Sequence, residues 1–182
     1  MHDPADPFDL DFTHFAPLPR VTPAQAQKLA PTVEAGSIQL KATGFFITIP
    51  RRNINARVTT RKPLILIIDD DLSICKILEK YLGNDGFETR LASNCDDIMR
   101  ELNRPPLPDL ILCDVEMPDA DGFDLLNKFH TSTVLGKVPV VMLTRRSEKS
   151  DIVRGLSLGA AGYITKPFKI GVLQDAMRNL LR

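Results

Sequence analysis

The chain has 182 residues, of which 43% are hydrophobic, 25% charged and 6% aromatic, and its net charge is zero. This length accommodates one well-buried domain of roughly 100–150 residues together with a smaller additional segment. No apolar run approaches the roughly 20 residues of a membrane-spanning helix, and residues 1–19 contain acids but no base, which argues against a secretory signal. We therefore expect a cytoplasmic protein without membrane contact.

The zero net charge hides an uneven distribution along the chain. Residues 20–62 contain eight bases and a single acid, Glu34, whereas residues 63–182 carry a slight excess of acids. An anionic partner could therefore be argued only from residues 20–62. Because aromatic residues do not alternate with these bases, nucleic acid is not expected as a partner.

Residues 1–62 are predicted to form an N-terminal extension or linker that is largely irregular. Proline disfavours helix interiors and central strands, and six prolines fall within residues 1–31. We therefore expect mostly extended chain there, with at most a short helical turn at residues 25–29. Residues 44–49 are rich in β-formers and lie between Gly44 and Pro50, which predicts a short strand or docking segment before a basic linker.

From Pro63 onward, short apolar runs alternate with segments of helical periodicity. The predicted strands cover residues 64–68, 87–91, 110–113, 138–143 and 162–164, and the predicted helices cover residues 72–82, 95–102, 123–129, 148–158 and 170–181. This alternation predicts an α/β domain at residues 63–182, with a five-stranded parallel sheet and helices on both faces. In such folds the functional crevice lies beyond the carboxyl ends of the strands.

Polar residues directly follow four of the predicted strands. They are Asp69, Asp70 and Asp71 after the first strand, Asp114 after the third, Thr144 after the fourth and Lys166 after the fifth. Carboxylates crowded at one edge repel each other unless a cation lies among them, and oxygen ligands suit Mg²⁺. An aspartate flanked by a metal, an ammonium and a hydroxyl is equipped to attack phosphorus. Asp71 is expected to cap the helix that follows it.

Four segments in this order resemble the receiver domain of bacterial two-component response regulators, the CheY-like receivers. They are Leu66–Asp71, Asp109–Gly122, Val140–Thr144 and Gly162–Phe168. The resemblance spans about 120 residues and implies a doubly wound (βα)5 flavodoxin-like fold. It also implies that Asp114 accepts a phosphoryl group from a histidine kinase or a phosphotransfer protein.

The resemblance further assigns roles to individual residues. Those implied for Mg²⁺ (or Mn²⁺) binding are Asp69, Asp70, Asp114 and the backbone carbonyl of Glu116. Thr144 and Lys166 would contact the phosphoryl group, and Tyr163 would be the aromatic residue that changes position with Thr144. The face built from the fourth helix, fifth strand and fifth helix of the repeat would respond, either by binding a partner or by dimerising.

Three residues near the predicted site are expected to tune the lifetime of the phosphoryl group: Glu116, Arg145 and Arg146. Arg145 occupies a place where the family usually has a small residue, so it could cover the site or bind the phosphate, although a solvated side chain is an equal alternative. Glu116 and Arg146 suggest a salt bridge across the entrance. Phosphotransfer and its reversal would then be self-catalysed, and we do not expect an enzyme.

Two alternatives remain open at this stage. A phosphatase of the haloacid dehalogenase type also places a nucleophilic aspartate after a strand, but it needs a second aspartate where this chain has Glu116. The sequence says less about how the receiver produces its output. The simplest interpretation is a receiver that acts through contacts with another protein. The alternative is an effector within residues 20–62 that binds nucleic acid or protein.

Overall fold

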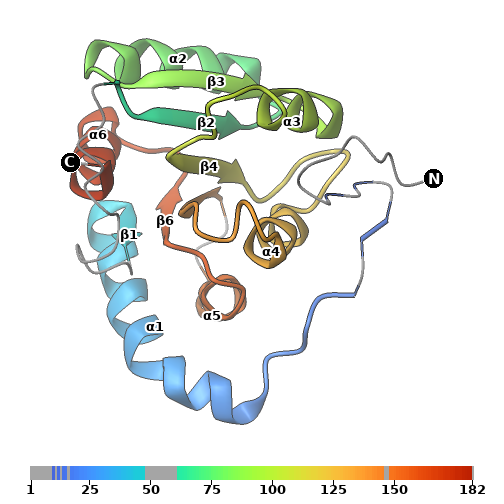
Figure 1. Cartoon of the computed structure of the whole chain (residues 1–182). Coiled ribbons are helices and arrows are strands. Elements are labelled where there is room, and N and C mark those ends of the chain that lie inside the picture. The colour runs from blue at the N-terminus through green and yellow to red at the C-terminus, as the bar shows by residue number, and fades with distance from the viewer. Residues whose placement is uncertain are drawn as a thin grey trace.

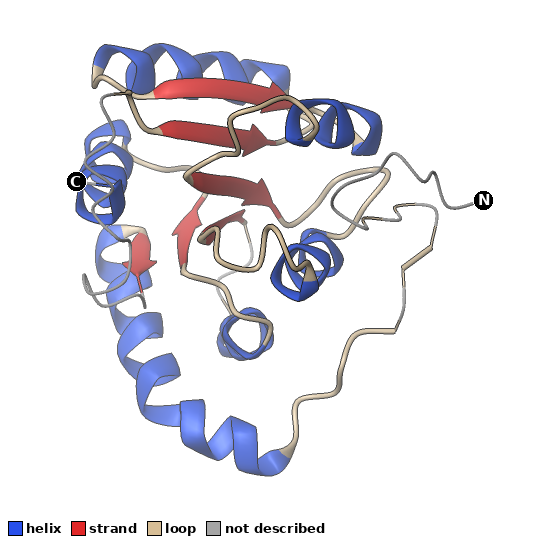
Figure 2. Cartoon of the chain, viewed as in Figure 1, coloured by secondary structure: helices blue, strands red, loops and turns tan. Residues whose placement is uncertain are grey.

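The computed structural model describes residues 17–47, 61–145 and 148–181, together with residues 10, 12, 14 and 15. These residues form a six-stranded sheet in the order β1-β6-β5-β4-β2-β3, with helices on both faces (Figure 1, Figure 2). The strands are β1 Phe45–Ile47, β2 Leu64–Ile68, β3 Glu88–Ala92, β4 Leu110–Asp114, β5 Val140–Thr144 and β6 Gly162–Thr165. The helices are α1 Pro23–Thr43, α2 Leu72–Asn84, α3 Cys95–Leu102, α4 Gly122–Thr131, α5 Lys149–Ser157 and α6 Ile170–Leu181.

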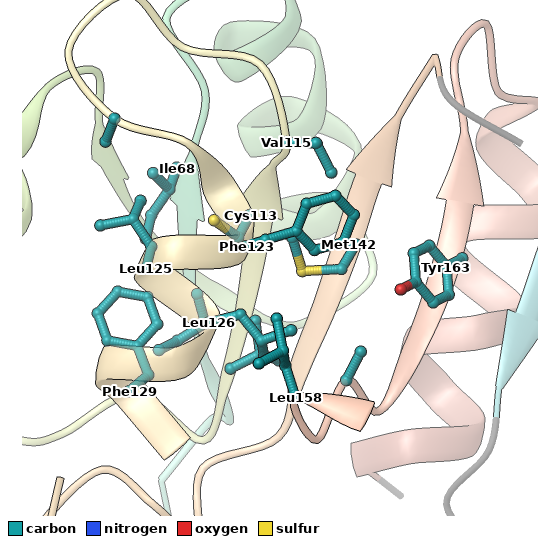
Figure 3. Packing of buried hydrophobic residues seen from close by; sticks show 14 of the residues in the cluster. Ile68, Cys113, Val115, Phe123, Leu125, Leu126, Phe129, Met142, Leu158 and Tyr163 are labelled. Atoms are coloured by element: carbon teal, nitrogen blue, oxygen red, sulfur yellow. The ribbon is translucent and has the colours of Figure 1, made fainter. Parts of the chain in front are cut away.

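Strands β2 to β6 are parallel, and the predicted five-stranded doubly wound α/β fold is confirmed. Every residue of β2, β4 and β5 is buried, as their continuous apolar runs require when both faces of a sheet are covered. One hydrophobic cluster packs the sheet against α2 and α6. A second cluster packs the other face against α3, α4 and α5 (Figure 3).

The N-terminal segment differs from the sequence prediction. Residues 23–43 form a continuous helix, α1, so the expectation of extended chain with a helical turn only at residues 25–29 is wrong for this stretch. Pro23 lies in the first turn, where no backbone N–H is needed, and Thr22 and Gln25 form a capping box. Pro31 lies inside the helix. Its cost is offset by burial of one helical face, formed by Val33, Gly36, Ser37 and Leu40.

Strand β1 lies within the segment 44–49 for which the sequence predicts a strand. It pairs antiparallel with β6 and thereby adds a sixth, edge strand to the five parallel ones. Gly44 makes this possible, because its φ of 79° lets the chain turn sharply from α1 into β1. The sheet therefore continues across the boundary that the sequence places at residue 63.

None of the helices in the described part of the chain combines the length and the hydropathy that crossing a lipid bilayer demands.

Candidate phosphoryl-acceptor and metal site

The polar residues predicted to gather at the carboxyl edge of the sheet lie there. Asp114 and Thr144 end β4 and β5, while Asp69 and Lys166 directly follow β2 and β6. Because these four strands are parallel neighbours, their last residues meet at one edge. The apolar run of each strand thus determines where its polar residue is placed.

Lys166 joins two of the carboxylates. Its Nζ donates a hydrogen bond to Oδ2 of Asp69 at 2.6 Å and another to Oδ2 of Asp114 at 2.8 Å. The three side chains are almost completely buried, with exposed fractions of 7% for Lys166, 0% for Asp69 and 8% for Asp114. Charge-assisted hydrogen bonds in such a setting are stronger than those at a surface.

Burial and pairing act in opposite directions on these groups. Burial raises the pKa of Asp69, and the hydrogen bond and charge of Lys166 only partly counteract it. Burial would lower the pKa of Lys166, but its hydrogen bonds to Asp114 and Asp69 outweigh that effect and the net direction is upward. Lys166 is therefore a firmly protonated cation at neutral pH.

Three carboxylates form a potential metal site. Asp69, Asp70 and Asp114 each offer an oxygen, and these oxygens all lie within 4.8 Å of one another. Asp69 and Asp114 are buried, whereas Asp70 is exposed, so the cluster opens to solvent on one side. A hard, all-oxygen donor set of this kind fits a divalent cation such as Mg²⁺, which keeps open positions for water or phosphate.

Asp71 is the helix cap that the sequence predicts. Its carboxylate accepts hydrogen bonds from the backbone N–H groups of Ser73 and Ile74 at the start of α2. Its own N–H donates to Oδ1 of Asp69 at 3.0 Å, which orients the Asp69 carboxylate. The three consecutive aspartates thus divide into two candidate ligands and one cap.

Thr144 and Tyr163 lie deeper in the domain. Thr144 is buried, and its carbonyl accepts a hydrogen bond from the Lys166 N–H at 2.8 Å. Tyr163 is fully buried, and its hydroxyl donates to the carbonyl of Asp151 in α5 at 3.1 Å. Figure 3 shows Tyr163 in the hydrophobic cluster that also contains Met142 and Phe123.

Two further predicted residues, Arg145 and Glu116, follow the strands that end at the site. Arg145 is exposed directly after β5. Glu116 forms an isolated antiparallel bridge with Asp121. The bridge lies in the loop that connects β4 to α4. Arg146 lies outside the described residues, so its expected salt bridge with Glu116 stays a prediction.

Two glycines that the sequence reasoning did not single out shape the site. A Cβ on Gly122 would lie 2.1 Å from the carbonyl oxygen of Asp114, so α4 can begin against the β4 backbone only with glycine there. A Cβ on Gly155 would lie 1.4 Å from the Tyr163 hydroxyl, so this glycine provides the space for that ring. An Asp-Gly pair at the predicted helix start was the available signal for Gly122; the sequence offered none for Gly155.

Comparison with known proteins agrees with this geometry. The family model described as the response regulator receiver domain matches residues 65–178. The transcriptional regulatory protein GltR of Pseudomonas aeruginosa is 39% identical over 118 residues, which are 65% of this chain and 48% of GltR. The phosphate regulon regulatory protein PhoB of Escherichia coli is 36% identical over 118 residues, with coverages of 65% and 51%. The chain thus spans about half the length of these curated relatives.

Solved structures of response regulators and receiver domains are also similar to this chain. A two-component response regulator from Clostridium difficile superimposes with a TM-score of 0.61 and 29% identity, covering 66% of this chain and 97% of that one. The signal receiver domain of a histidine kinase from Syntrophus aciditrophicus gives a TM-score of 0.59 and 36% identity, with coverages of 65% and 89%. With its doubly wound sheet and an edge cluster of aspartates and lysine, the chain belongs to the response regulator receiver domain family of two-component systems.

Proposed function

We propose that Asp114 is the phosphoryl acceptor of this receiver and that Asp69, Asp70, Asp114 and the Glu116 carbonyl hold the Mg²⁺ ion it requires. The observation that carries this proposal is the buried Lys166 ammonium, which contacts both Asp69 and Asp114. The arrangement leaves the Asp70 side of the cluster open, where a donor and a metal can enter. Mg²⁺, when bound, would supply positive charge for the phosphoryl oxygens.

The chemistry assigned to the chain is one group transfer. A carboxylate oxygen of Asp114 attacks the phosphorus of a phosphohistidine on a kinase or phosphotransfer protein. The new P–O bond gives an acyl phosphate, and the P–N bond breaks to return the imidazole. Lys166 stabilises the negative charge on the transferring group, and the Thr144 hydroxyl is the candidate donor to one phosphoryl oxygen.

Loss of the phosphoryl group follows from water attack on the same phosphorus, which regenerates the Asp114 carboxylate. Because Asp114 is almost completely buried, water can approach it only from the open side of the cluster next to Asp70. Because the group is accepted and lost by the protein's own side chain, we class the protein as a self-modifying switch rather than an enzyme.

The response is proposed to appear on the α5–β6–α6 face, which corresponds to the fourth helix, fifth strand and fifth helix of the repeat. Lys166 directly follows β6, and Tyr163 of β6 contacts α5, so both residues are placed to transmit a change at Asp114. An independent effector within residues 20–62 is not favoured, because the described part of that stretch packs on the receiver as α1 and β1.

Intact-mass analysis after incubation with a small phosphodonor and Mg²⁺ tests the proposal. We expect one phosphoryl adduct on the wild-type chain, no adduct on Asp114→Asn, and no adduct when the metal is chelated. Asp71→Asn is the matched control, because asparagine also caps helices and the site carboxylates are untouched. An adduct that survives in Asp114→Asn, with the protein folded, would show that another residue is the acceptor.

A further inference from the structure

Helix α1 and strand β1 of the N-terminal extension contact the α5–β6–α6 face of the receiver. Helix α1 packs against α5, and β1 extends the sheet by pairing with β6 (Figure 1). The register places Phe46 opposite Tyr163 and Ile47 opposite Gly162, and β1 also contacts α6. The extension is thus an internal occupant of the face on which the proposed response appears.

Two glycines make room for this occupant. A Cβ on Gly36 of α1 would lie 2.4 Å from the Phe46 ring, and a Cβ on Gly162 of β6 would lie 2.4 Å from the Phe46 carbonyl oxygen. Phe46 is buried, with an exposed fraction of 6%. Since one glycine makes room for its ring and the other for its backbone, β1 docks in close contact with both α1 and β6.

The docked strand also bonds to the backbone next to the acceptor site. The Gly44 carbonyl accepts hydrogen bonds from the Thr165 N–H at 2.9 Å and from the Thr165 hydroxyl at 3.2 Å. Lys166, the next residue, donates its N–H to Thr144 and its ammonium to Asp114. Gly44 is therefore connected to the site through its hydrogen bonds with Thr165 and the peptide bond from Thr165 to Lys166.

Tyr163 lies between the extension and the rest of the sheet. Its register partners are Met142 in β5 on one side and Phe46 in β1 on the other, and all three belong to one hydrophobic cluster. The path by which the ring could leave its buried position, over the edge of the sheet, is therefore occupied by Phe46.

We propose that α1 and β1 act as a latch, in which Phe46 holds Tyr163 buried, and that docking of this latch and phosphorylation of Asp114 stabilise each other. The second half rests on the proposed function. In the proposed function the Thr144 hydroxyl bonds a phosphoryl oxygen, and its movement toward Asp114 leaves room for the buried Tyr163 ring. Docking and phosphorylation then favour the same position of Tyr163, and each must strengthen the other by the same factor, because coupling between two equilibria is reciprocal. A partner of the α5–β6–α6 face must then displace the latch or bind to its outer surface.

The tyrosine content of the chain allows a direct test of the first half. The protein has two tyrosines and no tryptophan, so Tyr81→Phe leaves Tyr163 as the sole strong emitter. In that background we expect Phe46→Ala to raise the constant for acrylamide quenching of Tyr163 fluorescence at least about twofold, because the ring that keeps Tyr163 from solvent is removed. Ile38→Ala is the control, since Ile38 lies on α1 with 62% exposure and should leave the quenching constant unchanged.

Gly162→Ala provides a second route if Phe46→Ala does not fold. The added methyl group meets the backbone of β1, so it should undock the latch while the parallel strands remain paired. Undocking should also accelerate hydrogen exchange of the Thr165 amide, which loses its Gly44 acceptor. Unchanged quenching and unchanged exchange in a folded variant would overturn the latch.

The coupling is tested by adding a small phosphodonor and Mg²⁺ to the Phe46→Ala variant. Phosphorylation should lower its quenching constant toward the wild-type value, with the adduct verified by intact mass. A complete adduct without any change in quenching would overturn the coupling but not the proposed function. If neither the wild type nor any variant forms an adduct, both the coupling and the proposed function are overturned. The quenching constants of the unphosphorylated proteins would still decide whether Phe46 holds Tyr163 buried.

Discussion

The Lys166 ammonium lies 2.8 Å from Oδ2 of Asp114 and 2.6 Å from Oδ2 of Asp69, so a single cation is shared by two buried carboxylates. By formal charge Lys166 offsets only one of these two carboxylates, and the exposed Asp70 adds a third. This group of described residues therefore holds more acids than bases, which is the electrostatic reason that it should attract a divalent cation.

Replacing Lys166 with methionine should destabilise the metal-free protein at neutral pH. The substitution removes the only charge partner that the structure gives the Asp69 and Asp114 carboxylates among its described salt bridges, and such losses cost about 3–5 kcal/mol. Urea unfolding monitored by circular dichroism measures this loss, and Mg²⁺ should restore part of it. Lys169→Met, at an exposed position nearby, is the control and should be close to neutral. Equal stabilities for the two variants would contradict the role assigned to Lys166.

Neighbouring Asp70 and Asp71 should respond differently to substitution. Loss of even an outer-shell partner weakens metal binding by about 10–100-fold, so Asp70→Asn should weaken Mg²⁺ binding by at least about tenfold. Asp71→Ala should instead cost about 1 kcal/mol of stability through the lost helix cap, with Mg²⁺ affinity unchanged. Calorimetric titration and urea unfolding of both variants distinguish the two roles. If the wild type, Asp70→Asn and Asp71→Ala bind Mg²⁺ with similar affinity, Asp70 is not a ligand of the metal.

Arg145→Ala should shorten the lifetime of the phosphoryl group on Asp114. Arg145 is exposed directly after Thr144. We expect its guanidinium to shield the phosphoryl group from water. The dephosphorylation rate, followed by intact mass after removal of the donor, measures the effect. Arg104→Ala, in which an arginine of 69% exposure between α3 and β4 is removed, controls for the change in net charge. An unchanged rate would assign Arg145 to the solvated surface.

The sequence predicted the acceptor edge because strand direction determines it. The apolar runs of β2, β4 and β5 end directly before or at Asp69, Asp114 and Thr144, and parallel pairing brings these ends together. The end of each strand could be located from its own apolar run, without knowledge of distant contacts. This is why the gathering of the aspartates and Lys166 at one edge was accessible from the sequence.

The N-terminal helix was missed because its stability comes from contacts far away in the sequence. Pro31 and the weak apolar periodicity argue against α1 locally, yet Val33 and Leu40 are buried when α1 packs on α5 and β1. The orientation of Tyr163 was equally inaccessible. It depends on space left by Gly155 and on the cover provided by Phe46, neither of which has a local signature.

Gly155→Ala should force Tyr163 away from its observed position. The new methyl group would lie 1.4 Å from the Tyr163 hydroxyl, and overpacking of this kind costs about 1–3 kcal/mol. Adding Tyr163→Phe should recover part of the loss, so a double-mutant cycle should show favourable coupling between the two substitutions. Gly83→Ala is the matched control, because its Cβ meets nothing within 4 Å and should stabilise α2 by about 0.5–1 kcal/mol.

Alkaline titration should show that Tyr163 resists deprotonation in the folded protein. Burial raises its pKa well above the ordinary value of 10.0, with the charge of Asp151 adding to the effect. In the unfolded chain the same group releases its proton near its ordinary pKa. The free energy of unfolding should therefore be unaffected by Tyr163 below that pH and should fall as the pH rises above it. In the Tyr81→Phe background, the ultraviolet absorbance of tyrosinate should appear only together with the loss of circular dichroism. Tyrosinate formation near pH 10.0 in a fully folded protein would place the ring in contact with solvent and would contradict the buried position.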